Sequence, residues 1–351
     1  MIKRIMVPLD GSLLAEQALP LACTLASAFE AELLLTSAVH SSDQYGHYAG
    51  EENAGDLEEA GRLASEQYLS AREQQLAAEG FRVRIRTAPG RPPIVISSLC
   101  DLEGVDLVVM TTHGRSGVSR WTMGSVADKV LRTTDTPLIL IHPTAHGTPP
   151  SSINRVVVAL DGSELAEAAL PLAQRMAKSL NAKVHLVRAV VPSSLVFGAE
   201  YLPGTLPILE DMETEAKEYL TTTAAKLRSK GLTVSAVVRT GIPAEAILAE
   251  ATEAGDMVVM STHGRSGVDR WFLGSVADAV VRHGDIPVLV VRSWVPLDKP
   301  QYEEATPLIV ASIPPVIPVP AIHEHEEVVA AGKPRPAART SRPEARGRQL
   351  R

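Results

Sequence analysis

Short apolar runs alternate along the chain with longer segments in which apolar residues recur at helical spacing. Residues 4–9 (RIMVPL) form a β-rich apolar run, and residues 12–29 follow with helical periodicity and with Ser12 placed as an N-terminal cap. A second apolar run at 33–39 precedes an amphipathic helix expected over 56–80. The pattern therefore predicts strands and helices in alternation.

The same alternation continues to residue 142. Strands are expected at 82–87, 106–112 and 138–142, and helices begin between them at Pro92 and at Gly124. Five short strands separated by helices predict a parallel sheet covered on both faces and connected by right-handed crossovers. The predicted fold class is therefore α/β.

Both the element pattern and its polar motifs occur twice. RIMVPLDGSLLAEQALPLA at 4–22 recurs as RVVVALDGSELAEAALPLA at 155–173, and a glycine-rich segment at 112–137 recurs at 262–287 with most positions identical. Each copy is about 140 residues long, close to the commonest domain size. Two tandem Rossmann-like domains are therefore expected, each with a five-stranded parallel sheet between helices.

The repeat predicts a chain of four parts. These are a first domain over 1–146, a linker over 147–152, a second domain over 153–293 and a tail over 294–351. The linker is short and polar with two prolines, so we expect the domains to pack against each other. The tail is rich in proline and then in basic side chains, which is typical of disorder. Its alternative role is an electrostatic contact with an acidic partner or polyphosphate.

Composition and charge argue against several classes of function. The chain has 351 residues, of which 45% are hydrophobic and 21% charged, as in globular proteins. Aromatic residues make up 4%, too few for the stacking platforms that bind single-stranded nucleic acid. A formal charge of −7 gives no attraction to nucleic acid or anionic lipid. We expect no specific nucleic-acid partner.

The sequence contains no recognisable targeting segment and no cysteine motif. The first apolar run is too short for a signal peptide, and no apolar stretch approaches the ~20 residues of a membrane-spanning helix. Cys23 and Cys100 lack the spacing of a zinc site or of a disulfide framework. We therefore expect a cytoplasmic protein without membrane contact.

Two aspartates stand where parallel α/β sheets bind ligands, beyond the carboxyl ends of the strands. Asp10 and Asp161 each follow the first strand of their copy, and the glycine after each lets the chain turn into the next helix. A plain turn with an Asp or Ser helix cap would explain the same LDGS motif. Its position at the sheet edge favours a ligand role.

The glycine-rich segment after the fourth strand predicts an anion site. Gly114 and Gly117 can expose several backbone N–H groups to one point, and Arg115 can add positive charge. Gly124 and Ser125 directly precede an apolar helix, whose N-terminus adds free donors. Together these groups suit a triphosphate. The second copy repeats the set as Gly264, Arg265, Gly267, Gly274 and Ser275.

Other chemical motifs are missing from the sequence. It contains no P-loop, no GxGxxG after the first strand and no GxSxG nucleophile elbow. His113 and His263 are either acid–base groups or residues that pack the loop, and packing is favoured because no second repeated acid completes a dyad, apart from the aspartate of the first strand. Trp121 and Trp271 are expected to cover a domain or subunit contact.

At these motifs each half resembles a universal stress protein domain, and residues 1–293 resemble a tandem member of that family. The family's ATP-binding pattern is G-x-x-G, nine residues, then G-[ST]. Gly114, Gly124 and Ser125 fill its last three places, as do Gly264, Gly274 and Ser275 in the second copy. The first glycine is replaced by Thr111 and by Ser261.

The resemblance implies an adenine nucleotide alpha hydrolase-like fold that binds ATP or another adenine nucleotide. Asp10 and Asp161 would lie near the ribose or a phosphate-bound Mg²⁺ ion, and the backbones of Ala38 and Ala189 would contact the adenine. The family also implies pairing through the last strands, here as an intrachain pseudo-dimer, and a further homodimer of chains.

Three functions remain open at this point. The first is an ATP-binding stress-response module whose conformation or partners depend on the nucleotide. The second is a slow ATPase or phosphotransferase that uses Asp10 to hold Mg²⁺ and Ser125 to position phosphate. The third is a nucleotide-free scaffold. Asp269 replaces Ser119 in the second loop, so like-charge repulsion predicts tighter nucleotide binding in the first half.

Overall fold

A computed structural model describes residues 2–39, 51–113, 123–143, 151–192, 205–263 and 273–292, with the backbone alone at 51–54 and 205–208. All of these described residues belong to one compact unit. The predicted tail over 294–351 lies outside the described residues, and so do the glycine-rich loops. The domain limits predicted from the repeat therefore stay predictions.

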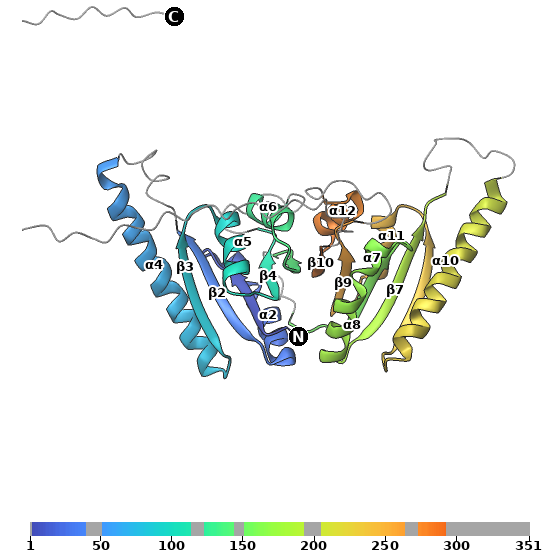
Figure 1. Cartoon of the computed structure of the whole chain (residues 1–351), viewed down its shortest axis with the longest axis horizontal. Helices are drawn as coiled ribbons and strands as arrows, with labels where there is room; N and C mark the ends of the chain where they lie inside the picture. Colours follow the sequence, from blue (N-terminus) through green and yellow to red (C-terminus); the bar gives the residue numbers. More distant parts are fainter. Residues whose placement is uncertain are drawn as a thin grey trace, which may run out of the picture. The chain divides into compact units, whose positions relative to one another are not determined.

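The strands of the two copies follow the predicted pattern. The first copy contains β1 (Arg4–Pro8), β2 (Glu32–Val39), β3 (Val83–Pro89), β4 (Leu107–Thr111) and β5 (Leu138–Ile141). The second contains β6 (Arg155–Leu160), β7 (Lys183–Val190), β8 (Val234–Thr240), β9 (Asp256–Ser261) and β10 (Val288–Val291). Helices connect consecutive strands within each copy, so the α/β class is confirmed (Figure 1).

The helices of the two copies also correspond. The first copy contains α1 (Leu13–Glu16), α2 (Leu19–Phe29), α4 (Glu51–Ala78), α5 (Pro92–Leu102) and α6 (Ser125–Thr133). The second contains α7 (Glu164–Glu167), α8 (Leu170–Ser179), α10 (Thr205–Arg228), α11 (Pro243–Glu250) and α12 (Ser275–His283). No helix in the described ranges is long and apolar enough to cross a bilayer.

All ten strands belong to one sheet, in the order β3-β2-β1-β4-β5-β10-β9-β6-β7-β8. Pairs within each copy are parallel, and β5 and β10 pair in the antiparallel sense, with Ile139 opposite Leu289. The predicted pairing of the last strands thus occurs within one chain.

The core lies on both faces of the sheet, as a parallel sheet requires. On β2, Leu33 and Leu35 join the apolar cluster that contains α2 and α4 residues, and Leu34 joins the opposite cluster with α5 and α6 residues. All three side chains are fully buried. The alternation follows from the two-residue period of a strand.

The structure corrects the helix boundaries predicted from periodicity. The single helix expected over 12–29 is two helices, α1 and α2, because Pro20 lies in the first turn of α2 and cannot continue a helix from the preceding turn. The helix expected at 56 begins at Glu51. The Ser12 cap is confirmed, since its hydroxyl accepts a hydrogen bond from the Ala15 N–H at 3.1 Å.

The two copies contact each other through the ends of equivalent strands and helices. Arg292, after β10, donates to the carbonyls of Arg132 and Thr134 at the end of α6, both at 2.8 Å. The ring of His142, which takes the same place after β5, contacts the Val281 carbonyl on α12. Each copy therefore caps the last turn of the other copy's helix, where carbonyls lack partners.

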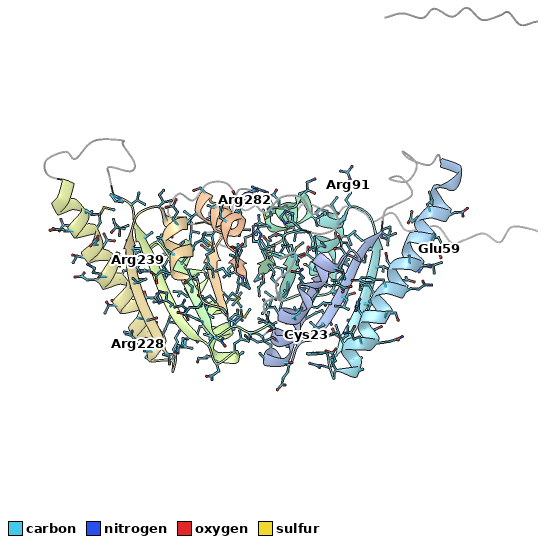
Figure 2. All side chains as sticks on the ribbon, turned by 180° about the vertical axis from the view of Figure 1, so that it is seen from behind. Cys23, Glu59, Arg91, Arg228, Arg239 and Arg282 are labelled. Carbon is cyan, nitrogen blue, oxygen red and sulfur yellow. The ribbon has the colours of Figure 1, made fainter. Side chains whose placement is uncertain are left out.

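A charge cluster lies between α6 and α12. Within each helix, Arg132 contacts Asp128 at 3.0 Å and Arg282 contacts Asp278 at 2.7 Å. Across the helices, Arg282 lies 3.6 Å from Asp128 and Arg132 lies 4.0 Å from Asp278. Figure 2 shows Arg282 on α12. The helices that follow Gly124 and Gly274 are thus also in electrostatic contact with each other.

Candidate functional site

A cavity of about 450 Å³, here called the first pocket, lies at the carboxyl ends of β1, β2 and β4. Its volume is in the range of small-molecule sites. Its wall includes most of the described residues predicted to bind a ligand. The first pocket is lined by Asp10, Thr36, Ala38, Thr111, His113, Gly124 and Ser125, among others.

The second copy has an equivalent cavity of about 420 Å³, here called the second pocket. It lies at the carboxyl ends of β6, β7 and β9 and includes the counterparts of the same predicted residues. The second pocket is lined by Asp161, Arg188, Ala189, Ser261, His263, Gly274 and Ser275, among others.

Glycine is required at the turn that leads into α6 and α12. The Gly124 N–H donates to the Thr112 carbonyl at 2.9 Å, and the Gly274 N–H donates to the Thr262 carbonyl at 2.8 Å. A Cβ atom at these positions would lie 2.6 Å and 2.9 Å from those same carbonyl oxygens. Because glycine has no side chain, the start of the helix can lie close against the end of the strand.

The helix start places backbone donors in the pocket wall. Ser125, Val126 and Ala127 all line the first pocket. Their N–H groups precede the first intrahelical bond of this turn, which runs from the Asp128 N–H to the Gly124 carbonyl at 3.0 Å. N–H groups of a first turn have no acceptor within the helix and attract anions.

The aspartates close a local turn at the rim of each pocket. The Asp10 carboxylate accepts hydrogen bonds from the Ser12 N–H at 3.0 Å and the Ser12 hydroxyl at 2.6 Å. Asp161 has the same partners on Ser163, at 2.9 and 2.6 Å. The turn predicted as the alternative is thus present, and the same carboxylate lines the cavity.

A magnesium ion would have few protein ligands here. No group of three or more His, Cys, Asp or Glu residues suited to a metal occurs within the described part of the chain. Mg²⁺ commonly keeps several waters and is bound through one or two carboxylates plus substrate phosphates. The single carboxylate of Asp10 fits an ion held mainly by a nucleotide, and does not fit a resident metal.

Side-chain hydrogen bonds stabilise the backbone just before each glycine-rich loop. The Thr111 hydroxyl donates to the His113 carbonyl at 2.7 Å, and the Ser261 hydroxyl donates to the His263 carbonyl. His113 Nδ1 lies 3.1 Å from the Thr112 hydroxyl. Both histidines also line the pockets, so their packing role stays a prediction.

The remaining predicted residues lie outside the described ranges. They are Gly114, Arg115 and Gly117, their counterparts Gly264, Arg265 and Gly267, the tryptophans Trp121 and Trp271, and the pair Ser119 and Asp269.

Sequence reasoning missed a charged pair that makes the second pocket different. Arg188 is 5% exposed and donates to Glu215 at 3.1 Å, and its guanidinium lies 5.1 Å from the centre of the Tyr219 ring. In the first copy Ser37 takes the place of Arg188, and Ala64 takes that of Glu215. A position-by-position comparison of the second strands would have revealed the difference.

Comparisons with known proteins identify the chain's relatives. The model of the universal stress protein family matches residues 1–142 and 152–292. The chain belongs to this family. It is 32% identical to universal stress protein YxiE of Bacillus subtilis over 146 residues, which are 40% of this chain and 99% of that protein. It is 29% identical to universal stress protein Rv2005c of Mycobacterium tuberculosis over 189 residues, covering 53% of this chain and 62% of that protein.

Solved universal stress proteins share the fold. A structure from Archaeoglobus fulgidus, 20% identical, covers 83% of this chain and 99% of its own with a TM-score of 0.62. Another solved universal stress protein is a complex with cAMP. It is 24% identical and covers 41% of this chain and 98% of its own, with a TM-score of 0.28.

Proposed function

We propose that this universal stress protein is a cytoplasmic, stress-responsive regulatory module that binds one adenine nucleotide, ATP, in each pocket. The proposal rests on the pair of equivalent cavities, each with a helix N-terminus in its wall at the carboxyl ends of parallel strands. Nucleotide occupancy would then change the conformation or the partners of the module.

The walls of the first pocket suit the two ends of a nucleotide. The backbone donors from Ser125 onward would bind phosphate, and Ala38, with the apolar side chains Val95 and Ile96 of α5, would receive the base. Asp10 would lie near the ribose or a phosphate-bound Mg²⁺ ion. When bound, that ion would supply positive charge to the phosphates.

The proposal is tested on ligands carried by the chain itself. We expect mass spectrometry of the protein purified without added nucleotide to detect AMP, ADP or ATP, and calorimetric titration of the emptied protein to give two ATP sites per chain. Steady ATP turnover that Asp10→Ala abolishes would support the enzyme hypothesis instead.

Matched variants show which pocket accounts for each of the two ATP sites. Ser125→Asp and Ser275→Asp each place a carboxylate in a first helical turn, which favours the helix but repels phosphate. Each is expected to reduce the stoichiometry from two to one, while Ser125→Ala retains both sites. No released nucleotide and no heat with ATP would contradict the proposal.

A further inference from the structure

Thr36, on β2, carries a buried hydroxyl that has no hydrogen-bond partner among the described residues. The residue is 1% exposed and lines the first pocket. No described protein group bonds this hydroxyl, and a hydroxyl buried without a partner destabilises the free chain. An unpaired polar group in the wall of a cavity points to a ligand that completes its hydrogen bond.

The position of Thr36 indicates which part of a nucleotide it would meet. Side chains alternate along a strand, so Thr36 shares its face of β2 with Ala38 and with the α5 side chains of the pocket wall. β1 separates β2 from β4, the strand that leads toward Gly124. Two strand spacings are about 10 Å. Thr36 therefore lies toward the nucleoside end rather than the triphosphate end.

The second copy lacks this hydroxyl and keeps the branched shape of the side chain. Val187 takes the place of Thr36 in the sequence repeat, lies fully buried on β7 and lines the second pocket. Valine can neither donate nor accept a hydrogen bond. At this position the two pockets differ in hydrogen bonding and hardly in size.

We propose that Thr36 is a specificity-determining residue that forms a hydrogen bond to the nucleoside part of the ligand in the first pocket. The inference rests on the proposed function. A buried group that needs a partner discriminates in favour of ligands that supply one. At this position the first pocket therefore offers the nucleoside a hydrogen bond that the second pocket lacks, and the repeat contains the control at Val187.

The test uses the full-length chain, titrated calorimetrically with ATP and with inorganic tripolyphosphate. Thr36→Val is expected to weaken ATP binding at one of the two sites about tenfold and to leave tripolyphosphate binding unchanged. The same variant is expected to raise the thermal unfolding midpoint of the free protein, because an unpaired hydroxyl has been removed. Thr36→Ser, which keeps the hydroxyl, retains the wild-type ATP affinity.

The reciprocal variant separates hydrogen bonding from a general effect on folding. Val187→Thr introduces a hydroxyl into the second pocket, so it is expected to lower the midpoint and to tighten ATP binding at that pocket. Unchanged ATP affinity in Thr36→Val overturns the inference. A lowered midpoint in Thr36→Val also overturns it, because the hydroxyl would then be paired in the free chain.

Failure of the proposed function has a separate signature. If the wild-type chain binds no ATP at either site, the nucleotide proposal is wrong and the role of Thr36 falls with it. If ATP binds at both sites of the wild-type chain and Thr36→Val changes neither affinity, the nucleotide proposal stands and the role of Thr36 is wrong.

Discussion

Gly124 is required by the close approach of two backbone segments and not by an unusual backbone conformation. Its φ of −61° is open to any residue, but a Cβ would lie 2.6 Å from the Thr112 carbonyl oxygen. That oxygen belongs to backbone at the end of β4 and cannot move away without shifting the strand.

Gly124→Ala should therefore destabilise the chain and damage the first pocket. We expect a loss of about 1–3 kcal/mol in the free energy of unfolding, typical of overpacking, and weaker ATP binding at one site. Urea denaturation and calorimetry measure the two effects. Gly55→Ala is the matched control, since nothing lies within 4 Å of its added Cβ. Within helix α4, alanine is more favourable than glycine by roughly 1 kcal/mol. Equal behaviour of the two variants would contradict this prediction.

Burial controls the reactivity of the cysteine on α2. Burial, together with the charge of Glu79, raises the pKa of Cys23, labelled in Figure 2, to about 11. The thiolate is the reactive form of cysteine. Alkylation of the folded protein at pH 8, followed by mass spectrometry, should label Cys23 far more slowly than the urea-unfolded chain. Equal labelling rates would show that the thiol is accessible and that its pKa is not raised.

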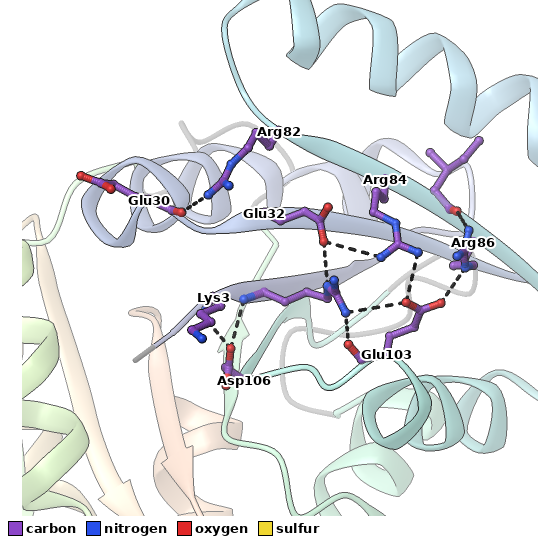
Figure 3. Close-up of polar contacts among 10 residues, drawn as sticks. Lys3, Glu30, Glu32, Arg82, Arg84, Arg86, Glu103 and Asp106 are labelled. Carbon is purple, nitrogen blue, oxygen red and sulfur yellow. Dashed lines mark hydrogen bonds and ion pairs between the residues drawn. The ribbon is translucent and has the colours of Figure 1, made fainter.

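At the scale of elements, a cluster of ion pairs joins the edge strand β3 to β2 and to the end of α5. Glu103, just after α5, lies 2.6 Å from Arg86 and 3.3 Å from Arg84 on β3, and 3.7 Å from Arg4 on β1 (Figure 3). Arg84 and Arg4 also face Glu32 on β2, at 3.8 and 2.7 Å. The charges occupy a strand whose outer edge has no neighbour in the described sheet, where charged residues discourage pairing with other chains.

The cluster predicts a loss of stability in acid. The hydrogen bond from Arg86 lowers the pKa of Glu103, burial opposes that shift, and the charges of Arg84 and Arg4 lower the pKa further. A group with a lowered folded pKa stabilises the folded chain above its unfolded pKa, 4.5 here. This stabilisation is lost as the pH falls through the folded value.

Glu103→Gln tests the acid effect directly. We expect it to remove about 1 kcal/mol of stability at pH 7, and we expect the difference from the wild-type chain to shrink as the pH falls below about 4. Urea denaturation across this range measures both. Glu59→Gln, which breaks a more exposed pair with Arg62, should have a smaller effect. A constant difference at every pH would refute the role of the carboxylate charge.

The sequence pattern predicts the strands well because each is a compact apolar run between turn signals. Helix ends are harder to predict, since Pro20 divides a segment whose apolar period is continuous. Asp10 and Ser125 could be proposed because their motif is repeated. Thr36 could not, because its importance depends on burial and on the absence of a hydrogen-bond partner. Arg188 stands at a position where the two copies differ, so a comparison of the copies reveals the residue, but its burial and its contact with Glu215 come from the structure.

At the scale of the whole molecule, the pairing of β5 with β10 joins the two copies. Arg292, whose side chain is 11% exposed, links the second copy to the end of α6 in the first. Cationic donors at a helix C-terminus satisfy its last carbonyls and interact favourably with its dipole.

Arg292→Ala should consequently weaken the contact between the copies. We expect a loss of about 1–3 kcal/mol, since two charged hydrogen bonds to partly buried carbonyls disappear, measured as a lower urea midpoint. Arg292→His copies the residue that stands at position 142 and should retain part of the stability. An unchanged midpoint in Arg292→Ala would show that strand pairing alone holds the copies together.

The continuous ten-stranded sheet has a consequence for how the pockets can diverge. In a symmetric dimer of identical subunits, every substitution appears in both sites, so a change that spoils one spoils the other. Covalent duplication removes that constraint. One half can acquire Arg188, Glu215 and Val187 while its neighbour keeps a different lining, and both continue to share a sheet that neither could complete alone.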